Sequence, residues 1–466
     1  MVAQRRFRPR VFESGDVELF DALRKLFAHR LPILLDSAQG EPSRWSVLAF
    51  DPLPNAIDER RGVLGLREAL ASLHAEGGDE IPGPFHGGLV CALSYDLGAS
   101  GERRVECARE PFEFPLLVGG LYVDFLVRDE ALRRTWLVLG DEPGDARADV
   151  SARRAVVQAE LAFEPPRSKL RAEALVRSVT STEHRARIER CREFIAQGEI
   201  YQANIAHRFT CAAAGLPHDW YERLRAANPA PYMAFARWRA SDGFAPEGAL
   251  LSASPELLVE FDGRCARTRP IKGTSARSDD VREDLRRGEQ LLASAKDRAE
   301  LAMIVDLERN DLARVALPGE VWVEGFPYLA SYPRVHHLMA DVVAVTRPEI
   351  DAFDVLAALF PGGSITGAPK LRAMELIARL EGEGRGFFSG SLGYVDLRGH
   401  AAFNILIRTA LWRAQPEGGE FSLRFGGGIT WASDALAEDA ETLTKAAGWI
   451  DALQLDRPVA SRPQPR

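Results

Sequence analysis

Apolar residues in the first third of the chain recur in short alternating segments, separated by loops rich in glycine, proline and acidic residues. Examples are LPILLDSA, residues 31–38, and GGLYVDFLVRD, residues 119–129. Such alternation is typical of half-buried strands. It predicts strands of an antiparallel or mixed sheet over residues 1 to about 165.

The segment FEPPRSKLRAE, residues 163–173, interrupts this pattern with two prolines and several charges, which is typical of a linker. A helix is expected next, in EHRARIERCREFIAQGE, residues 183–199. Gly198 is a plausible stop for that helix. Four apolar residues fall on one helical face: Ile188, Cys191, Phe194 and Ile195.

The remainder of the chain interleaves strand-like and helical patterns. Strand-like runs cover 248–263, 320–325, 339–346, 389–397, 401–412 and 421–430. Helical runs cover 280–315, 351–360, 369–380 and 433–453. Because strands and helices come in unequal clusters, the pattern favours an α+β fold over a regular βαβ repeat. We predict an N-terminal region at 1–165, a main domain at 175–455 and a disordered tail at 456–466.

Composition limits the classes of function. The 466 residues are 46% apolar and 27% charged, which is ordinary for a globular protein with an ample core. The formal net charge of −8 argues against a nucleic-acid surface. An anionic substrate therefore requires local basic groups or a metal ion.

Cysteine usage and the N-terminus bear on location. The five cysteines are scattered without a C-x-x-C pair, so the sequence predicts neither a disulfide framework nor a zinc site. The basic start MVAQRRFRPRVF is not followed by an apolar run, and no stretch approaches the roughly 20 apolar residues of a membrane span. We expect a cytoplasmic protein with no membrane partner.

Two pairs of acidic residues stand at helical spacing. Asp297 and Glu300 are three residues apart, as are Glu438 and Glu441, so each pair projects two carboxylates from one helix face. If the two helices face each other, the four groups could hold one Mg²⁺ ion. They could equally be solvated helix surfaces, although the apolar run after Glu300 disfavours this. Lys445, four residues after Glu441, is either its salt-bridge partner or a ligand for a substrate carboxylate.

Two glycine-rich segments are candidate anion sites. FPGGSITGAPK, residues 360–370, places glycines, Ser364 and Thr366 just before a predicted helix. RFGGGIT, residues 424–430, is a second loop that a ligand could approach closely. Either segment could also be an ordinary turn. Arg408 lies inside an apolar strand-like run and needs a carboxylate partner, from the protein or from a substrate.

Lys272 in TRPIKGTSAR is one of only six lysines. Unlike arginine, a lysine removed from water can lose its proton and become a nucleophile. The alternative is a salt-bridging loop lysine. The adjacent His336 and His337 alternate along a strand-like run, so only one of them can point into a given face.

Together these segments resemble the chorismate-utilising enzyme family, which includes anthranilate, aminodeoxychorismate, isochorismate and salicylate synthases. The resemblance covers about 190–448 and is carried by GEIYQANIAHRF, NPAPYMAF, SASPELLV, RPIKGTSAR, AELAMIVDLERNDL, VHHLMADV, LFPGGSITGAPKLRAMELI, GSLGYVDLRGHAAFNILIRT and GGGITWASDALAEDAETLTKA. It implies a large α/β sandwich of two subdomains, with antiparallel-rich sheets inside and helices outside.

The resemblance also implies roles for the candidate residues. Glu300 and Glu441 would bind Mg²⁺ directly, and Asp297 and Glu438 would bind it through water. Glu256 would be a general acid and His337 the active-site histidine, leaving His336 structural. The residues implied to bind chorismate are Thr274, Thr366, Arg408, Gly426, Gly427, Gly428 and Lys445.

Position 272 points to one branch of the family. P-I-K-G-T is the mark of the aminodeoxychorismate synthases, whereas anthranilate synthases resemble P-I-A-G-T. Gln202 stands where isochorismate and salicylate synthases carry a water-activating lysine. Phe388 falls where anthranilate synthases tend to have a tyrosine. The branch implies a covalent Lys272 adduct of chorismate and a 4-amino-4-deoxychorismate product for the synthesis of 4-aminobenzoate and folate.

No cysteine lies in a glutaminase setting, so the resemblance implies a separate glutamine amidotransferase subunit that supplies ammonia. Two alternatives are anthranilate synthase component I and a catalytically silent homologue that binds chorismate or tryptophan.

A tryptophan pocket is a further expectation. LPILLDSAQGEPSRWSVLAFDP resembles the Leu-Leu-Glu-Ser segment that shapes this pocket in anthranilate synthases, with Asp36 in place of the glutamate. The candidate residues are Leu34, Asp36 and Ser37.

Overall fold

The computed structural model describes residues 5–38, 44–54, 57, 61–100, 105, 108–142, 149–454 and 459–460. Most of the tail predicted to be disordered, 456–466, lies outside the described residues. Val459 and Ala460 form a short strand that runs parallel to residues 175–176.

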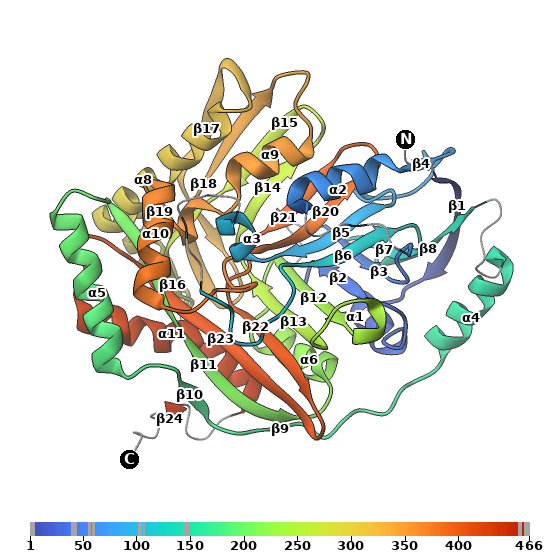
Figure 1. Cartoon of the computed structure of the whole chain (residues 1–466), viewed down its shortest axis with the longest axis horizontal. Helices are drawn as coiled ribbons and strands as arrows, with labels where there is room; N and C mark the ends of the chain where they lie inside the picture. Colours follow the sequence, from blue (N-terminus) through green and yellow to red (C-terminus); the bar gives the residue numbers. More distant parts are fainter. Residues whose placement is uncertain are drawn as a thin grey trace.

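Helices lie on the outside of the molecule and strands fill the interior (Figure 1). The helices are α1 (Leu19–Lys25), α2 (Gly62–Ala71), α3 (Tyr95–Ser100), α4 (Val150–Ala162), α5 (Ser181–Ala196), α6 (Pro217–Ala227), α7 (Val281–Ala293), α8 (Ala295–Ala313), α9 (Ala352–Leu359), α10 (Lys370–Glu381) and α11 (Ala435–Leu453).

The strands form two sheets. The larger sheet has the order β24-β10-β11-β23-β22-β13-β12-β2-β3-β7-β8-β1-β4, with β9 and β19 also paired to β11. Its strands are β1 (Arg5–Gly15), β2 (Ile33–Asp36), β3 (Trp45–Ala49), β4 (Leu73–Ala75), β7 (Phe125–Asp129), β8 (Arg134–Asp141), β9 (Arg171–Ala172), β10 (Leu175–Arg177), β11 (Gln202–Ala214), β12 (Tyr232–Trp238), β13 (Gly248–Ser254), β19 (Gly367–Ala368), β22 (Thr409–Gln415), β23 (Gly418–Ile429) and β24 (Val459–Ala460).

The smaller sheet has the order β16-β18-β15-β14-β21-β20-β5-β6, with β17 paired to β18. Its strands are β5 (Gly88–Leu93), β6 (Leu117–Tyr122), β14 (Leu257–Phe261), β15 (Cys265–Arg269), β16 (Ile271–Ala276), β17 (Ala316–Ser331), β18 (Val335–Thr346), β20 (Ser391–Asp396) and β21 (Ala401–Asn404). Among the described strands, only the β1–β4 and β10–β24 pairs are parallel. The predicted α+β class with antiparallel-rich sheets is confirmed.

Packed apolar side chains join the two sheets into a sandwich. One buried cluster contains Phe125 of β7 and Leu392 of β20, and so draws on both sheets. A second cluster buries Leu301 of α8 against the smaller sheet, and a third buries Trp449 of α11 against the larger one. Each large apolar side chain buried in this way stabilises the fold by about 1.5–3 kcal/mol.

The first 165 residues contribute strands to both sheets. β2 pairs with β12 in the larger sheet, and β5 pairs with β20 in the smaller one. The predicted boundary near residue 165 therefore does not separate two independently formed sheets. The segment between α4 and β9, which includes most of the predicted linker, has no helix or strand.

The predicted helix at 183–199 is confirmed as α5. Its start is fixed by a capping box, in which the Thr180 side chain accepts from the Glu183 backbone and the Glu183 side chain accepts from the Thr180 backbone.

Three other expectations need correction. The helical run at 280–315 is two helices, because Ser294 leaves the helical conformation and its side chain caps α8. The strand-like run at 401–412 is interrupted after β21, so Arg408 lies in a connection with a φ of 51°. The glycines of 424–430 belong mostly to β23 and are paired to β11, so this segment is not a loop.

No helix in the described part of the chain is long and apolar enough to cross a membrane.

Candidate active site

Lys272 lies at an irregular point of β16. The register with β18 shifts between Ile271 and Thr274, and Gly273 has a φ of 83°. A Cβ at Gly273 would stand 2.9 Å from Cγ of Asp297, so the absence of a side chain lets β16 approach α8 closely. Lys272 is therefore held beside the helix that carries the first acidic pair.

The Lys272 amine is half-buried and has no hydrogen-bond or ion-pair partner among the described residues. Burial lowers the pKa of Lys272, while Glu256, Glu300 and Glu441 act to raise it. The net direction is downward, which favours the neutral amine that a nucleophile requires.

Glu256 follows β13 in the segment SASPELLV and is 4% exposed. Its Oε1 atom has no hydrogen-bond partner. Burial raises the pKa of Glu256, and the neighbouring Ser364, Lys272 and Arg408 act against this rise. A carboxyl group with a raised pKa beside an amine with a lowered pKa is a suitable acid–base pair.

The second acidic pair lies on α11. Oε1 of Glu438 accepts a hydrogen bond from Ser433 at 2.7 Å. Glu441 pairs with Nζ of Lys445 at 2.8 Å, and the same amine donates to the carbonyl of Gly426 at 2.7 Å. Lys445 is therefore a salt-bridge partner of Glu441, as the first predicted interpretation required, and it also reaches β23. Its role as a ligand for a substrate carboxylate stays a prediction.

The two acidic pairs lie near each other. Burial raises the pKa of Glu300, and the charges of Asp297 and Glu438 add to that rise, against the effects of Lys272 and Lys296. An accumulation of carboxylate oxygens fits a hard cation such as Mg²⁺. Within the described residues, however, no three His, Cys, Asp or Glu side chains already meet in a metal-binding cluster. The carboxylate groups are thus of the kind that binds the predicted Mg²⁺ ion, while Glu441 forms an ion pair with Lys445.

The glycines of β23 bring backbone close to these side chains. A Cβ at Gly427 would stand 2.8 Å from Oε2 of Glu438, and one at Gly428 would stand 2.9 Å from Nε2 of Gln202. A Cβ at Gly426 would stand 2.4 Å from the carbonyl oxygen of Ile205 in β11. Side chains at these positions would push α11 and Gln202 away from the strand.

Gln202 is fully buried, and neither amide atom has a hydrogen-bond partner in the part of the chain that the structure describes. An unpaired buried amide is costly, so Gln202 is a candidate for contact with a bound molecule.

Arg408 is half-buried, and its guanidinium has no ion-pair partner in the described part of the chain. Its carbonyl accepts hydrogen bonds from Trp449 Nε1 and the Ala253 backbone, each at 3.2 Å, which fixes the connection. Burial lowers the pKa of Arg408, while Glu256 acts to raise it. An arginine without a protein carboxylate in contact is suited to a substrate carboxylate.

The two histidines have different partners, as their alternation predicts. His337 is buried, and its Nδ1 lies 2.9 Å from Oγ1 of Thr274. Burial lowers the pKa of His337 to about 3, so this imidazole is neutral. His336 contacts Ser331 at 2.8 Å and Asp284 at 3.0 Å, which agrees with a structural role.

Thr366 is fully buried before α10, where its hydroxyl donates to the carbonyl of Gly362 at 2.8 Å. The hydroxyl oxygen keeps the capacity to accept a hydrogen bond.

A cavity of about 280 Å³ lies between the two sheets. Of the predicted tryptophan-pocket residues, Asp36 and Ser37 line it, whereas Leu34 belongs to the core on the side of α6. The Asp36 carboxylate accepts hydrogen bonds from Tyr221 at 3.0 Å and Arg225 at 2.9 Å, so it is bound to α6. The cavity also contains polar groups that the sequence did not single out: Arg44, Glu260, Arg267, Arg269, Tyr232 and Asn404.

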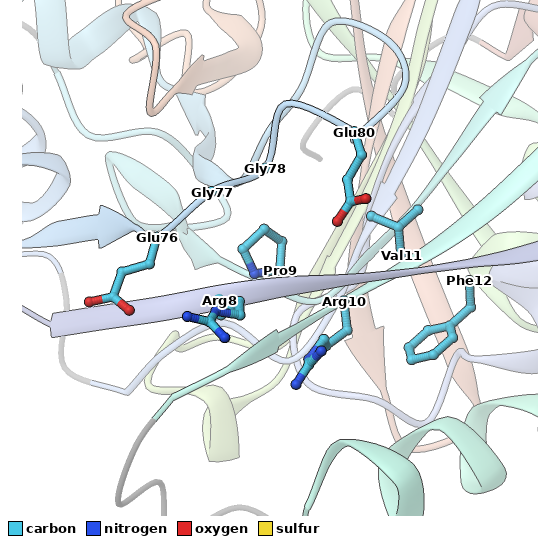
Figure 2. A pocket seen from close by; sticks show the side chains of 9 residues that line it. All are labelled: Arg8, Pro9, Arg10, Val11, Phe12, Glu76, Gly77, Gly78 and Glu80. Atoms are coloured by element: carbon cyan, nitrogen blue, oxygen red, sulfur yellow. The ribbon is translucent and has the colours of Figure 1, made fainter.

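A second pocket lies at the surface along β1 and the segment after β4 (Figure 2). Arg8, Arg10, Glu76 and Glu80 supply its charged lining. None of the predicted site residues lines this pocket.

Sequence reasoning overlooked Glu308 of α8, which is 2% exposed beneath the site. A signal was present, because Glu308 falls four residues after Ile304 and seven after Leu301, both on the buried face of α8.

The chain as a whole is similar to known proteins. The chain matches the family described as chorismate binding enzyme over residues 38–451, and it belongs to that family. The relatives include two branches. Aminodeoxychorismate synthase component 1 of Escherichia coli K12 is 37% identical over 362 residues, covering 78% of this chain and 76% of the relative. Anthranilate synthase component 1 of Streptomyces coelicolor is 36% identical over 439 residues, covering 90% and 83%.

A solved structure supports the same fold. The crystal structure of anthranilate synthase component I from Streptococcus pneumoniae TIGR4 superposes with a TM-score of 0.72 at 26% identity, covering 88% of this chain and 92% of that one.

Proposed function

We propose that this chain is the chorismate-converting component of an aminodeoxychorismate synthase, which forms 4-amino-4-deoxychorismate from chorismate and ammonia for the synthesis of 4-aminobenzoate and folate. The observation that carries the proposal is Lys272, an unpartnered and half-buried amine beside the buried acid Glu256. Relatives from several organisms carry the name aminodeoxychorismate synthase component 1, at 31–38% identity.

Substrate binding would use cations and hydrogen-bonding groups near Lys272. Arg408 is suited to the enolpyruvyl carboxylate, together with the backbone of Gly426–Gly428. Thr274, Thr366 and Lys445 would complete the pocket, with His337 as a neutral hydrogen-bonding group. Glu300 and Glu441, with Asp297 and Glu438 through water, would hold Mg²⁺, which when bound neutralises the ring carboxylate of chorismate.

The reaction uses two displacements. The neutral amine of Lys272 forms a bond to C2, the ring double bond shifts, and the C4–oxygen bond breaks. Glu256 gives its proton to the departing hydroxyl, which leaves as water. Ammonia then forms a bond to C4 and the C2–nitrogen bond breaks, which restores the Lys272 amine.

Ammonia would come from a glutamine amidotransferase subunit. Burial raises the pKa of the Cys191 and Cys211 thiols to about 12, and it also raises that of Cys91. A glutaminase nucleophile needs a lowered pKa. Cys265 lies on β15 outside any such setting, and Cys107 lies outside the described residues. We therefore propose a cytoplasmic heterodimer with that subunit.

The second candidate is anthranilate synthase component I, in which ammonia attacks C2 of the same substrate. It is favoured by the relative from Streptomyces coelicolor, which aligns with 90% of this chain.

The test is product formation from chorismate, Mg²⁺ and ammonium by the chain and by Lys272→Ala. We expect aminodeoxychorismate from the chain, and 4-aminobenzoate once the lyase that removes pyruvate is added. We expect no product from the variant and full activity from Lys169→Ala, a control at an exposed lysine. Fluorescent anthranilate as the product, or undiminished activity of Lys272→Ala, would contradict the proposal.

The cavity between the sheets is our proposed tryptophan pocket. Residues of both sheets line this cavity, which supports a role for a bound tryptophan in holding the two sheets together. Titration of the chain with tryptophan in a calorimeter, compared with Ser37→Trp, tests it. Equal heats of binding for the two proteins would contradict it.

A further inference from the structure

Two buried carboxyl groups lie near β15, the strand that precedes Lys272. Glu256 stands at the start of β14, and Glu308 lies on α8 two turns beyond Glu300; they are 4% and 2% exposed. The antiparallel ladder between β14 and β15 pairs Leu257 with Arg269, so Glu256 and Thr268 are diagonal neighbours on one face of the two strands, a separation that a long side chain can span. Thr268 in turn contacts Glu308.

Among the described residues, Glu308 has one hydrogen-bond donor and no cation in an ion pair with it. Oγ1 of Thr268 donates to Oε2 of Glu308 at 3.0 Å. The nearby Lys370 is already held by Oδ2 of Asp311 at 2.5 Å and by the carbonyl of Leu359 at 2.9 Å. A buried carboxylate with a single hydroxyl donor is strongly destabilised, so one proton must be retained in this region.

Glu256 has the opposite surroundings. Lys272 and Arg408 lie near it and favour its ionised form. Its Oε1 atom accepts no hydrogen bond. Burial raises the pKa of Glu256 against these two cations, and a further negative neighbour would strengthen that rise in the acid that has to protonate the leaving hydroxyl.

The charges of Glu256 and Asp311 act on Glu308 in the same direction as burial. Burial raises the pKa of Glu308 well above its usual range, and the charge of Glu256 adds to the rise, as does Asp311, against Thr268 and Lys370. Two carboxyl groups in one buried site cannot both ionise at neutral pH, so their titrations are shared.

We propose that Glu308 is a positioning residue that shares one proton with Glu256 and thereby keeps Glu256 in its acid form for donation to the leaving hydroxyl. This rests on the proposed function, in which Glu256 is that acid. Glu308 itself does not contact the reacting atoms.

The protons that move in the reaction are exchanged among Glu256, Lys272 and the reacting groups, and Glu308 shares the proton of Glu256. Glu256 loses its proton to the hydroxyl, which departs as water, and regains one from the Lys272 nitrogen after that nitrogen has bonded to C2. In the second displacement Glu256 returns a proton to the departing Lys272 nitrogen and takes one from the nitrogen newly bound to C4. Glu308 restores the resting state, because ionisation of both acids is disfavoured throughout.

The experiment compares Glu308→Gln with the unmodified chain in ammonium-dependent turnover across pH. Without the second acid, Glu256 loses its proton more easily, so the alkaline limb of kcat should move about one pH unit lower. At a pH on that limb kcat should fall about tenfold, with KM changed less than twofold. Glu308→Asp should restore at least half of the shift. Glu110→Gln, at a buried acid outside the site, should leave the profile unchanged.

Infrared spectroscopy provides a readout that does not depend on turnover. The protonated-carboxyl band of the chain at pH 7 should lose intensity in Glu308→Gln, and thermal unfolding shows whether the variant is folded. An unchanged pH profile together with an unchanged carboxyl band would overturn the inference. If the chain makes no aminodeoxychorismate at all, the proposed function fails, while the carboxyl band still decides whether Glu308 holds a proton.

Discussion

Lys272 and Lys370 are both half-buried lysines, yet their surroundings differ completely. Lys370, at the start of α10, forms an ion pair with Asp311 and a hydrogen bond to a backbone carbonyl. Lys272 has neither kind of partner among the described residues. The difference teaches that partial burial alone does not indicate a reactive lysine, and that the lack of a partner is what supports the role proposed for Lys272.

The largest expected effect separates the two lysines by activity. Lys272→Met should reduce the rate of product formation by at least about 10³-fold, because the nucleophile is lost. Its free energy of unfolding should stay the same or rise by up to about 1 kcal/mol, since an unpartnered cation is removed from a half-buried site. Turnover and urea unfolding measure the two quantities. Destabilisation by more than about 2 kcal/mol would mean that Lys272 also supports the fold.

The converse effect is expected at Lys370. Lys370→Met should destabilise the fold by about 3 kcal/mol, because Asp311 is left as a buried charge without its partner. Urea unfolding measures this loss. The matched control is Lys370→Met combined with Asp311→Leu, which removes both charges and should recover at least half of the loss. No recovery would show that the two side chains act independently.

The pH dependence sharpens the comparison further. In the proposed reaction only the neutral amine attacks, so the rate should fall about tenfold per pH unit as pH drops below the pKa of Lys272. Because burial lowers the pKa of Lys272, this limb should lie below the usual lysine value of about 10.4. A profile of kcat/KM against pH measures it. A limb at or above the usual value would indicate a solvated lysine.

The smallest effect is expected at an exposed lysine. Lys296 is 3.9 Å from Glu300, and its side chain is 65% exposed. Lys296→Ala should change the free energy of unfolding by less than about 0.5 kcal/mol, because solvent screens the pair. Thermal unfolding measures the change. A loss of more than about 1 kcal/mol would place Lys296 with Lys370 among the structural lysines.

The sequence pattern was most informative where periodicity and capping agreed. The α+β class and the position of α5 follow from apolar spacing, and the capping box explains the start of that helix. The acidic spacing placed Asp297 with Glu300 on α8 and Glu438 with Glu441 on α11, as the structure confirms.

Other features depend on pairing that sequence alone does not reveal. The glycines at 426–428 suggested a loop because glycine is common in turns, but the ladder to β11 makes them strand residues that admit close side chains. Arg408 was expected within a strand, and its left-handed backbone interrupts the run. The hydrogen bonds from Arg225 and Tyr221 to Asp36 form because α6 packs against β2. No local sequence pattern predicts that packing.

The close approach of Gly273 to Asp297 has a consequence for which positions tolerate substitution. The contact between β16 and α8 is made by a residue without a side chain, and Lys272 stands next to it. Replacement of Lys272 is therefore expected to leave the helix that carries Asp297 and Glu300 in place. Any side chain at Gly273 would instead force the two elements apart.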